Sequence, residues 1–172
     1  MEPNTVANVE VAATGNVYLA ATGTPLPANW HSTLNAGFVN VGYIGEDGVD
    51  ETINTDTTDI VAWGGDLVRV VQTKHSLEYG FTMYETTDTN LASFYGSTSV
   101  IKGDALPHQV MVIDWQDGDK WRRNVYPDVQ ITSRESRKLA SSEVAAFGVT
   151  ITCFPDTSGN KAYMYRDEDS VS

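Results

Sequence analysis

Two short acidic turns hold the densest clusters of side chains that could do chemistry. Both place several carboxylates beside glycine: Gly45-Glu46-Asp47-Gly48-Val49-Asp50-Glu51 and Asp114-Trp115-Gln116-Asp117-Gly118-Asp119. Carboxylate oxygens are good calcium ligands, but a calcium loop needs them at fixed alternate positions followed by a distant glutamate. Neither segment has that spacing. We therefore interpret both as turns and expect no metal site.

Residues that could act as nucleophiles or general bases are isolated in the sequence. His31, His75 and His108 lie far apart, and Cys153 sits in an alternating apolar segment that suits a buried strand position. A nucleophile needs a base beside it, and the familiar hydrolase, zinc-protease and nucleotide-loop motifs are absent. We expect no catalytic residue, no cofactor and no enzymatic activity. A site assembled only by the fold stays open as an alternative.

The composition excludes several classes of protein. The chain has 172 residues with 11 Lys and Arg against 23 Asp and Glu, a net charge of −12. Such an acidic protein is poorly suited to gripping nucleic acid or an anionic membrane. No apolar stretch approaches the roughly 18 residues of a membrane span, and the first residues lack the basic start and apolar run of a signal peptide. We expect one domain, made in a reducing cytoplasm.

The charges are segregated along the chain. Residues 1–68 contain nine acids and no Lys or Arg, whereas most basic residues lie between positions 102 and 138. Opposite charges on separate surfaces can attract copies head to tail, and such contacts build rings or filaments. If charge drives assembly, salt should slow it. We predict a basic partner surface formed by Arg122, Arg123, Arg134, Arg137 and Lys138.

Short strands separated by turns predict a mainly β fold. In the segment 75–85, Leu77, Tyr79, Phe81 and Met83 alternate with polar residues, which is the period of a half-buried strand. The other expected strands are 16–21, 38–44, 67–73, 109–115, 121–126, 128–132, 148–154 and 161–166. Because strands do not alternate with helices, the pattern favours an antiparallel β-sandwich or barrel.

One short α-helix is predicted after residue 87. Asp88 or Thr89 can cap its start, and Gly96 suits its end. Leu91, Phe94 and Tyr95 then fall on one face at helical spacing.

Residues 45–59 are too polar to build a core of their own. Long connections of this kind are usually functional or disordered. We expect a protruding arm or hairpin, about 46–59, that docks on a neighbouring copy, with Trp63 beside Gly64-Gly65 as a further contact. The contact residues would be Glu46, Asp47, Asp50, Glu51, Ile53, Asp56, Asp59 and Trp63. Residues 1–15 would form a flexible arm, 16–166 the β domain, and 167–172 an acidic tail that frays.

Four segments keep a fixed order along residues 16–166. They are Val17-Tyr18-Leu19-Ala20-Ala21 followed by Gly23-Thr24-Pro25-Leu26-Pro27; Phe38-Val39-Asn40-Val41-Gly42-Tyr43-Ile44-Gly45-Glu46-Asp47-Gly48; Asp59-Ile60-Val61-Ala62-Trp63-Gly64-Gly65; and Gly148-Val149-Thr150-Ile151-Thr152-Cys153-Phe154-Pro155-Asp156. As an ordered set they resemble the major tail (tail tube) proteins of long, flexible-tailed bacteriophages, especially those of actinobacterial hosts. That family has no catalytic residues to carry over.

The resemblance implies a tail tube fold whose subunit closes into a hexameric ring. Rings would stack around a tape measure protein, meet tail terminator and distal tail proteins, and later let double-stranded DNA through. The arm at 46–59, residues 1–15 and the tail after Arg166 would make the contacts between rings. The protein would be assembled in the host bacterial cytoplasm and reside in the virion tail.

An acidic wall suits a conduit, because it repels the DNA backbone and lets the molecule slide. The candidate lumen acids are Glu78, Glu85 and Asp114. Two alternatives stay open. The aromatic residues could instead serve a monomeric carbohydrate-binding β-sandwich, and a related tube from a contractile tail or secretion system would share the fold.

Overall fold

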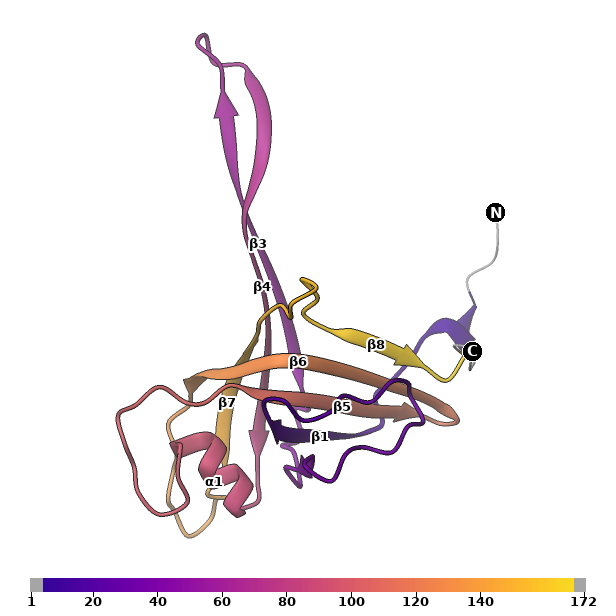
Figure 1. Cartoon of the computed structure of the whole chain (residues 1–172), viewed down its shortest axis with the longest axis vertical. Helices are drawn as coiled ribbons and strands as arrows, with labels where there is room; N and C mark the ends of the chain where they lie inside the picture. The colour runs from indigo at the N-terminus through magenta and orange to yellow at the C-terminus, as the bar shows by residue number, and fades with distance from the viewer. Residues whose placement is uncertain (1–4, 169–172) are drawn as a thin grey trace.

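The structure, a computed structural model, describes residues 5–168. It shows a body built on a curved sheet, from which one long hairpin projects (Figure 1). The strands and helix of this part are β1 (Thr14–Ala21), β2 (Val39–Asn40), β3 (Asp50–Val61), β4 (Leu67–Met83), α1 (Asp88–Tyr95), β5 (Gln109–Asp117), β6 (Lys120–Arg134), β7 (Phe147–Cys153) and β8 (Tyr163–Arg166). Within residues 5–168, no helix is long and apolar enough to cross a membrane.

The strands pair antiparallel in the order β2-β1-β5-β6-β7-β4-β3, and β8 pairs with β6. The segment that follows β2 pairs with the end of β4 through an isolated antiparallel bridge between Ile44 and Met83. Two further backbone bonds join the same segments, from Gly45 N–H to the Thr82 carbonyl and from Tyr84 N–H to the Tyr43 carbonyl, each 2.9 Å. The sheet therefore curls into a barrel-like body, and the predicted antiparallel β fold with one short helix is confirmed.

The core follows the predicted alternation. Leu77, Tyr79, Phe81 and Met83 are all buried, on the same side of β4. The central strand β5 is apolar on both faces: Met111 and Ile113 join this main core, while Val110 and Val112 belong to a smaller cluster with Val125 and Phe38. Strands buried on both faces lie inside a sheet, as β5 does between β1 and β6.

The N-cap of helix α1 lies one residue before the predicted start, whereas its C-cap is the predicted Gly96. Thr87, not Asp88 or Thr89, is the N-cap, and its hydroxyl accepts a hydrogen bond of 3.2 Å from Asn90 N–H. Gly96 ends the helix in the left-handed region at φ 80°, which glycine adopts without strain. Phe94 packs edge-on against Phe147 of β7, with ring centroids 5.1 Å apart.

Several predicted strands have different bounds, and the two expected at 67–73 and 75–85 are one continuous strand, β4. The strand expected at 38–44 is reduced to Val39–Asn40. The two strands expected around Pro127 are one strand, β6, because an extra residue between Tyr126 and Val129 forms a bulge that accommodates the proline. Residues 50–59 of the arm expected at 46–59 lie in β3.

Candidate functional site

The β3–β4 hairpin extends far beyond the body (Figure 1). β3 pairs with β4 from Asp50 opposite Gly80 to Val61 opposite Leu67. Every residue of β3 is exposed, and so is the part of β4 before Ser76 apart from the half-buried Val71. A protruding hairpin was predicted, but its bounds are wrong. Residues 46–49 belong to a loop of the body, and the hairpin also includes residues 60–75, which the sequence predicts to lie in the β domain outside the arm.

The distal end of the hairpin is mainly apolar, with Asp66 and Arg69 as its charged residues. Trp63 lies in the turn and is fully exposed, and Gly64 and Gly65 shape this turn with φ of 116° and 94°. The other exposed apolar residues here are Ile60, Val61, Leu67, Val68 and Val70. Exposed apolar patches are common at interaction surfaces of proteins. We call residues 60–70 the hairpin tip.

The predicted acidic contacts lie nearer the body. Asp50, Glu51, Asp56 and Asp59 follow β3, and Asp56 stands directly opposite Lys74 of β4. Ile53 is also exposed, opposite the buried Leu77. Glu46 and Asp47 lie in the loop that precedes β3. The structure thus brings most of these residues onto one hairpin but separates Glu46 and Asp47 from it.

Arg122 lies inside the subunit and holds both ends of the described chain. Its guanidinium bonds to Glu10 near one end and to Asp167 (2.7 Å) and Glu168 (3.2 Å) near the other. These carboxylates raise the pKa of Arg122, with Glu10 contributing most. Only 7% of Arg122 is exposed. Its assignment to a basic partner surface is therefore wrong.

The terminal segments are attached where the structure describes them. Besides Glu10, Val11 N–H bonds to the Asp117 carboxylate (2.9 Å) and Ala13 N–H to the Gln116 carbonyl (3.1 Å). Asp167 accepts a bond of 3.0 Å from Trp121 N–H. The expectation that these parts are free is wrong for residues 10–13 and 167–168. Residues 1–4 and 169–172 of the predicted arm and tail lie outside the described part.

Arg123 and Asp114 form a buried pair, so neither belongs to an exposed surface. Each is 9% exposed. Arg123 also donates to the Ser32 carbonyl at 2.6 Å. The assignment of Arg123 to the partner surface and of Asp114 to the lumen is therefore wrong, because each neutralises the other inside the body.

The remaining basic candidates divide into packed and exposed residues. Arg137 is half-buried against the Phe147 ring, 4.0 Å from its centroid, and donates to Tyr95 Oη at 2.7 Å. Arg134 is exposed and donates to the Phe94 carbonyl at 2.8 Å. Lys138 is exposed and pairs with Glu143 at 2.7 Å. The predicted surface thus reduces to Arg134 and Lys138, each already holding a partner in its own chain.

The other lumen candidates are half-buried. Glu85 accepts a hydrogen bond of 3.0 Å from Tyr43 N–H. Its carboxylate lies beside Gly42, whose φ of 84° is in the left-handed region that favours glycine. Glu78 stands opposite Thr52 on one side and Thr152 on the other, on the face of the sheet away from the core.

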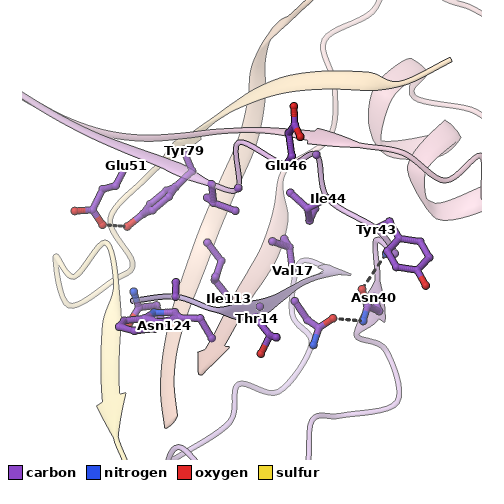
Figure 2. A pocket seen from close by; sticks show the side chains of 18 of the residues that line it. Thr14, Val17, Asn40, Tyr43, Ile44, Glu46, Glu51, Tyr79, Ile113 and Asn124 are labelled. Carbon is purple, nitrogen blue, oxygen red and sulfur yellow. Dashed lines mark hydrogen bonds between the residues drawn. The ribbon is translucent and has the colours of Figure 1, made fainter. Parts of the chain in front are cut away.

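A cavity of about 940 Å³ opens in the body beside the start of β3. Val17, Ile44 and Ile113 line its middle, and Tyr79 donates a hydrogen bond to Glu51 at its edge (Figure 2). Burial raises the pKa of Tyr79 and of Tyr126, which also lines the cavity. The Tyr126 ring packs edge-on against the Tyr79 ring, with centroids 4.8 Å apart. Sequence reasoning missed this cavity because its residues come from five separate segments.

Two side chains with potential reactivity, Cys153 and His108, lie in different surroundings. Burial raises the pKa of the Cys153 thiol to about 12, so the thiolate nucleophile is scarce near neutral pH. Nδ1 of His108 lies 2.6 Å from Asp128. Among residues 5–168, no three His, Cys, Asp or Glu side chains gather closely enough to hold a metal ion. The most exposed tryptophans, Trp63 and Trp121, lie on different elements.

Comparison with known proteins identifies the family. A family model described as "Phage tail tube protein" matches residues 1–172. No curated protein matches. One similar solved structure is a chain of the anti-feeding prophage tube-terminating cap, with 11% identity, a TM-score of 0.55 and 95% of each chain covered. Another is a chain of the sheath–tube complex of an extracellular contractile injection system, PVC, in its extended state. It has 11% identity and a TM-score of 0.52, and the match covers 92% of this chain and 93% of that chain. At this identity the two structures show a shared fold. The family match covers the whole sequence, and the chain therefore belongs to the phage tail tube protein family.

Proposed function

We propose that this protein forms hexameric rings that stack into the tail tube of a long, flexible-tailed phage and conduct DNA into the host. Membership of the tail tube family supports the structural role in a virion tail. The observation that carries the proposal is the β3–β4 hairpin, which projects from the body with its apolar tip uncovered.

Contact with another chain would explain why the hairpin projects so far from the body. β3 has 12 residues, which at about 3.3 Å each give a length of about 40 Å. A two-stranded hairpin alone in water is only marginally stable. β3 is also an edge strand, so one row of its backbone groups has no strand partner in the described subunit. Contact with a second copy would cover the tip and give that edge a partner.

A polar face of the sheet is the best candidate for the tube lumen. Thr52, Glu78, Thr152 and Gln130 stand opposite one another in a row across β3, β4, β7 and β6. The next row, Ile53, Leu77, Cys153 and Val129, points the other way, and its last three members are in the core. In this row the carboxylate of Glu78 would repel DNA phosphates, while the neutral threonine and glutamine side chains carry no charge that would hold the backbone. Of the predicted lumen acids, we retain Glu78.

The other proposed partners are the tail proteins and the DNA that a tail tube would contact. Such a conduit would surround a tape measure protein during assembly and end against tail terminator and distal tail proteins. Passing double-stranded DNA would make no specific contact with the wall. Assembly would take place in the host bacterial cytoplasm.

Electron microscopy of a hairpin-trimmed variant tests the proposal. Residues 55–75 are replaced by Asn-Gly, a two-residue turn that joins the opposed Asn54 and Ser76. Because the removed residues lie outside the core, the variant should keep a wild-type thermal transition. We expect concentrated wild-type protein to form rings and tubes and the trimmed variant to form none. Tubes from both proteins, or none from the wild type, would contradict the proposal.

A further inference from the structure

The hairpin separates from the sheet of the body at a defined point on β4. β4 pairs with β7 as far as Leu77, which stands opposite Cys153. From there towards the tip, β4 pairs with β3 alone in the part of the chain that the structure describes. His75 lies in this two-stranded part, two positions beyond Leu77 and opposite Thr55. Two-stranded ribbons twist more freely than wider sheets, so contacts at the base decide their direction.

A lysine from a distant segment contacts the hairpin at this base. Lys161 Nζ donates a hydrogen bond of 2.7 Å to the His75 carbonyl and lies 3.0 Å from His75 Nδ1. Figure 1 shows the connection between β7 and β8, which carries Lys161, beside the lower part of the hairpin. An ammonium group has three N–H donors, so one side chain can serve both acceptors. Hydrogen bonds from a charged donor are also stronger than neutral ones.

The turn that precedes Lys161 is held by Asp156. Asp156 N–H donates to the Asn160 carbonyl, and Asn160 N–H donates back to Asp156 Oδ1, each over 2.9 Å. The Asp156 carboxylate also accepts a bond of 2.8 Å from Ser158 N–H and one from the Tyr163 hydroxyl. Lys161 itself is half-buried. The ammonium therefore reaches the hairpin from a well-supported turn of the body.

A small change of direction at the base becomes large at the tip. The register between β3 and β4 shifts between Asp56 and Thr57, directly beyond Thr55, and such irregularities bend and twist a ribbon. From Thr55 to Val61, at about 3.3 Å per residue, the hairpin extends about 23 Å past the lysine contact. Over that length a swing of about 20° moves the tip by about 8 Å, which is enough to separate it from any surface that it contacts.

We propose that Lys161 is the positioning residue of the hairpin. Its bonds to His75 fix the direction in which the tip leaves the free subunit, so that a neighbouring copy meets a hairpin that is already oriented. The role in assembly rests on the proposed function, whereas the direction of the hairpin is a property of the single subunit. Without the lysine, a smaller fraction of subunits would be competent to bind, and the apparent affinity would fall by the same factor.

Distances between two spin labels on the free subunit test the positioning. Thr58→Cys places one label on the exposed hairpin, and Asp119→Cys places the other at the exposed turn between β5 and β6. Burial raises the pKa of the natural Cys153 thiol to about 12, so this residue takes up little label. Double electron–electron resonance on dilute protein, before any assembly, then gives the distribution of hairpin directions.

Three substitutions are compared in this labelled protein. Lys161→Met keeps an unbranched apolar side chain but has no donor, and we expect it to broaden the distance distribution at least about twofold. Lys161→Arg keeps charged donors and should restore most of the narrow distribution. Lys138→Met is the control, because this exposed lysine pairs with Glu143 away from the hairpin. All three should keep a wild-type thermal transition, since neither lysine belongs to the core. An unchanged distribution for Lys161→Met would overturn the proposal.

The assembly threshold, measured on unlabelled protein by light scattering, provides the second readout. If one subunit in ten keeps the correct hairpin direction, Lys161→Met should raise the protein concentration needed for assembly by about tenfold, and Lys138→Met should leave it unchanged. A broader distribution with an unchanged threshold would overturn the role of this orientation in assembly. A broader distribution in a protein whose wild type never forms tubes would support the positioning by Lys161 and overturn the ring-and-tube function.

Discussion

The guanidinium of Arg123 binds the carboxylate of Asp114 through two hydrogen bonds, from Nε to Oδ1 and from Nη2 to Oδ2, each 2.7 Å long. The two residues stand opposite each other on β6 and β5. Both side chains are 11% exposed, so the pair is shielded from water. It joins the two central strands and, through the Ser32 carbonyl, fixes the loop between β1 and β2.

Breaking this pair should destabilise the subunit. Asp114→Asn leaves the Arg123 charge buried without its counter-charge, and we expect a loss of about 3–5 kcal/mol in the free energy of unfolding. Urea denaturation measures the change. The exposed Lys138–Glu143 pair is the matched control, and Lys138→Ala should cost less than about 1 kcal/mol. Similar small losses for both variants would show that the Asp114–Arg123 pair is not a structural element of the body.

Acid should release the C-terminal segment from β6. The Trp121 N–H and then the Arg122 guanidinium lower the pKa of Asp167 below its ordinary 3.8. A carboxyl with a depressed pKa contributes stability that is fully present above the unfolded value and is lost as the pH falls through the folded value. Attachment should therefore persist at neutral pH and fail only below 3.8.

The Trp121 amide resonance, followed by NMR during an acid titration, reports this release. Asp167→Asn should remove the transition, and Arg122→Ala should move it to higher pH. A wild-type transition above 3.8 would contradict the assigned cause.

Assembly should be insensitive to salt or promoted by it. The sequence suggested attraction between an acidic arm and a basic surface, but Arg122 and Arg123 are neutralised inside the subunit and the hairpin tip is apolar. Copies with a net charge of −12 repel one another, and salt screens that repulsion. Excluded salts such as sulfate also strengthen apolar contacts. Light scattering across a salt series checks this, and steadily slower assembly with added salt would restore the charge-driven model.

Reversing the charge of Glu78 should slow DNA passage without preventing assembly. Glu78→Lys adds a cation to the proposed lumen face, where six copies per ring would bind phosphates by counterion release. Phage carrying the variant should form tails of normal length but eject DNA more slowly, and the difference should shrink at high salt. Glu143→Lys, on an exposed loop, is the control. Wild-type ejection kinetics for Glu78→Lys would remove this face as the lumen.

The sequence predicts the elements that bury an alternating face and misses those whose role depends on distant residues. Leu77 to Met83, the central strand β5 and the helix ending at Gly96 were all predictable, because each carries a local pattern. β3 was not, because a run of threonine and aspartate with both faces exposed has no periodicity to detect. The ion pairs that Arg122 forms with Glu10 and Arg123 forms with Asp114 depend on residues far apart in the sequence, and so does the cavity around Tyr126. These features arise only when separate segments meet in the fold.

Cryo-electron microscopy of the concentrated wild-type protein tests the central claim most directly. We predict hollow tubes of stacked six-membered rings, in which each β3–β4 hairpin reaches a subunit of the next ring. Particles that remain monomeric at every concentration, or that close into two-fold dimers with the hairpins uncovered, would contradict it.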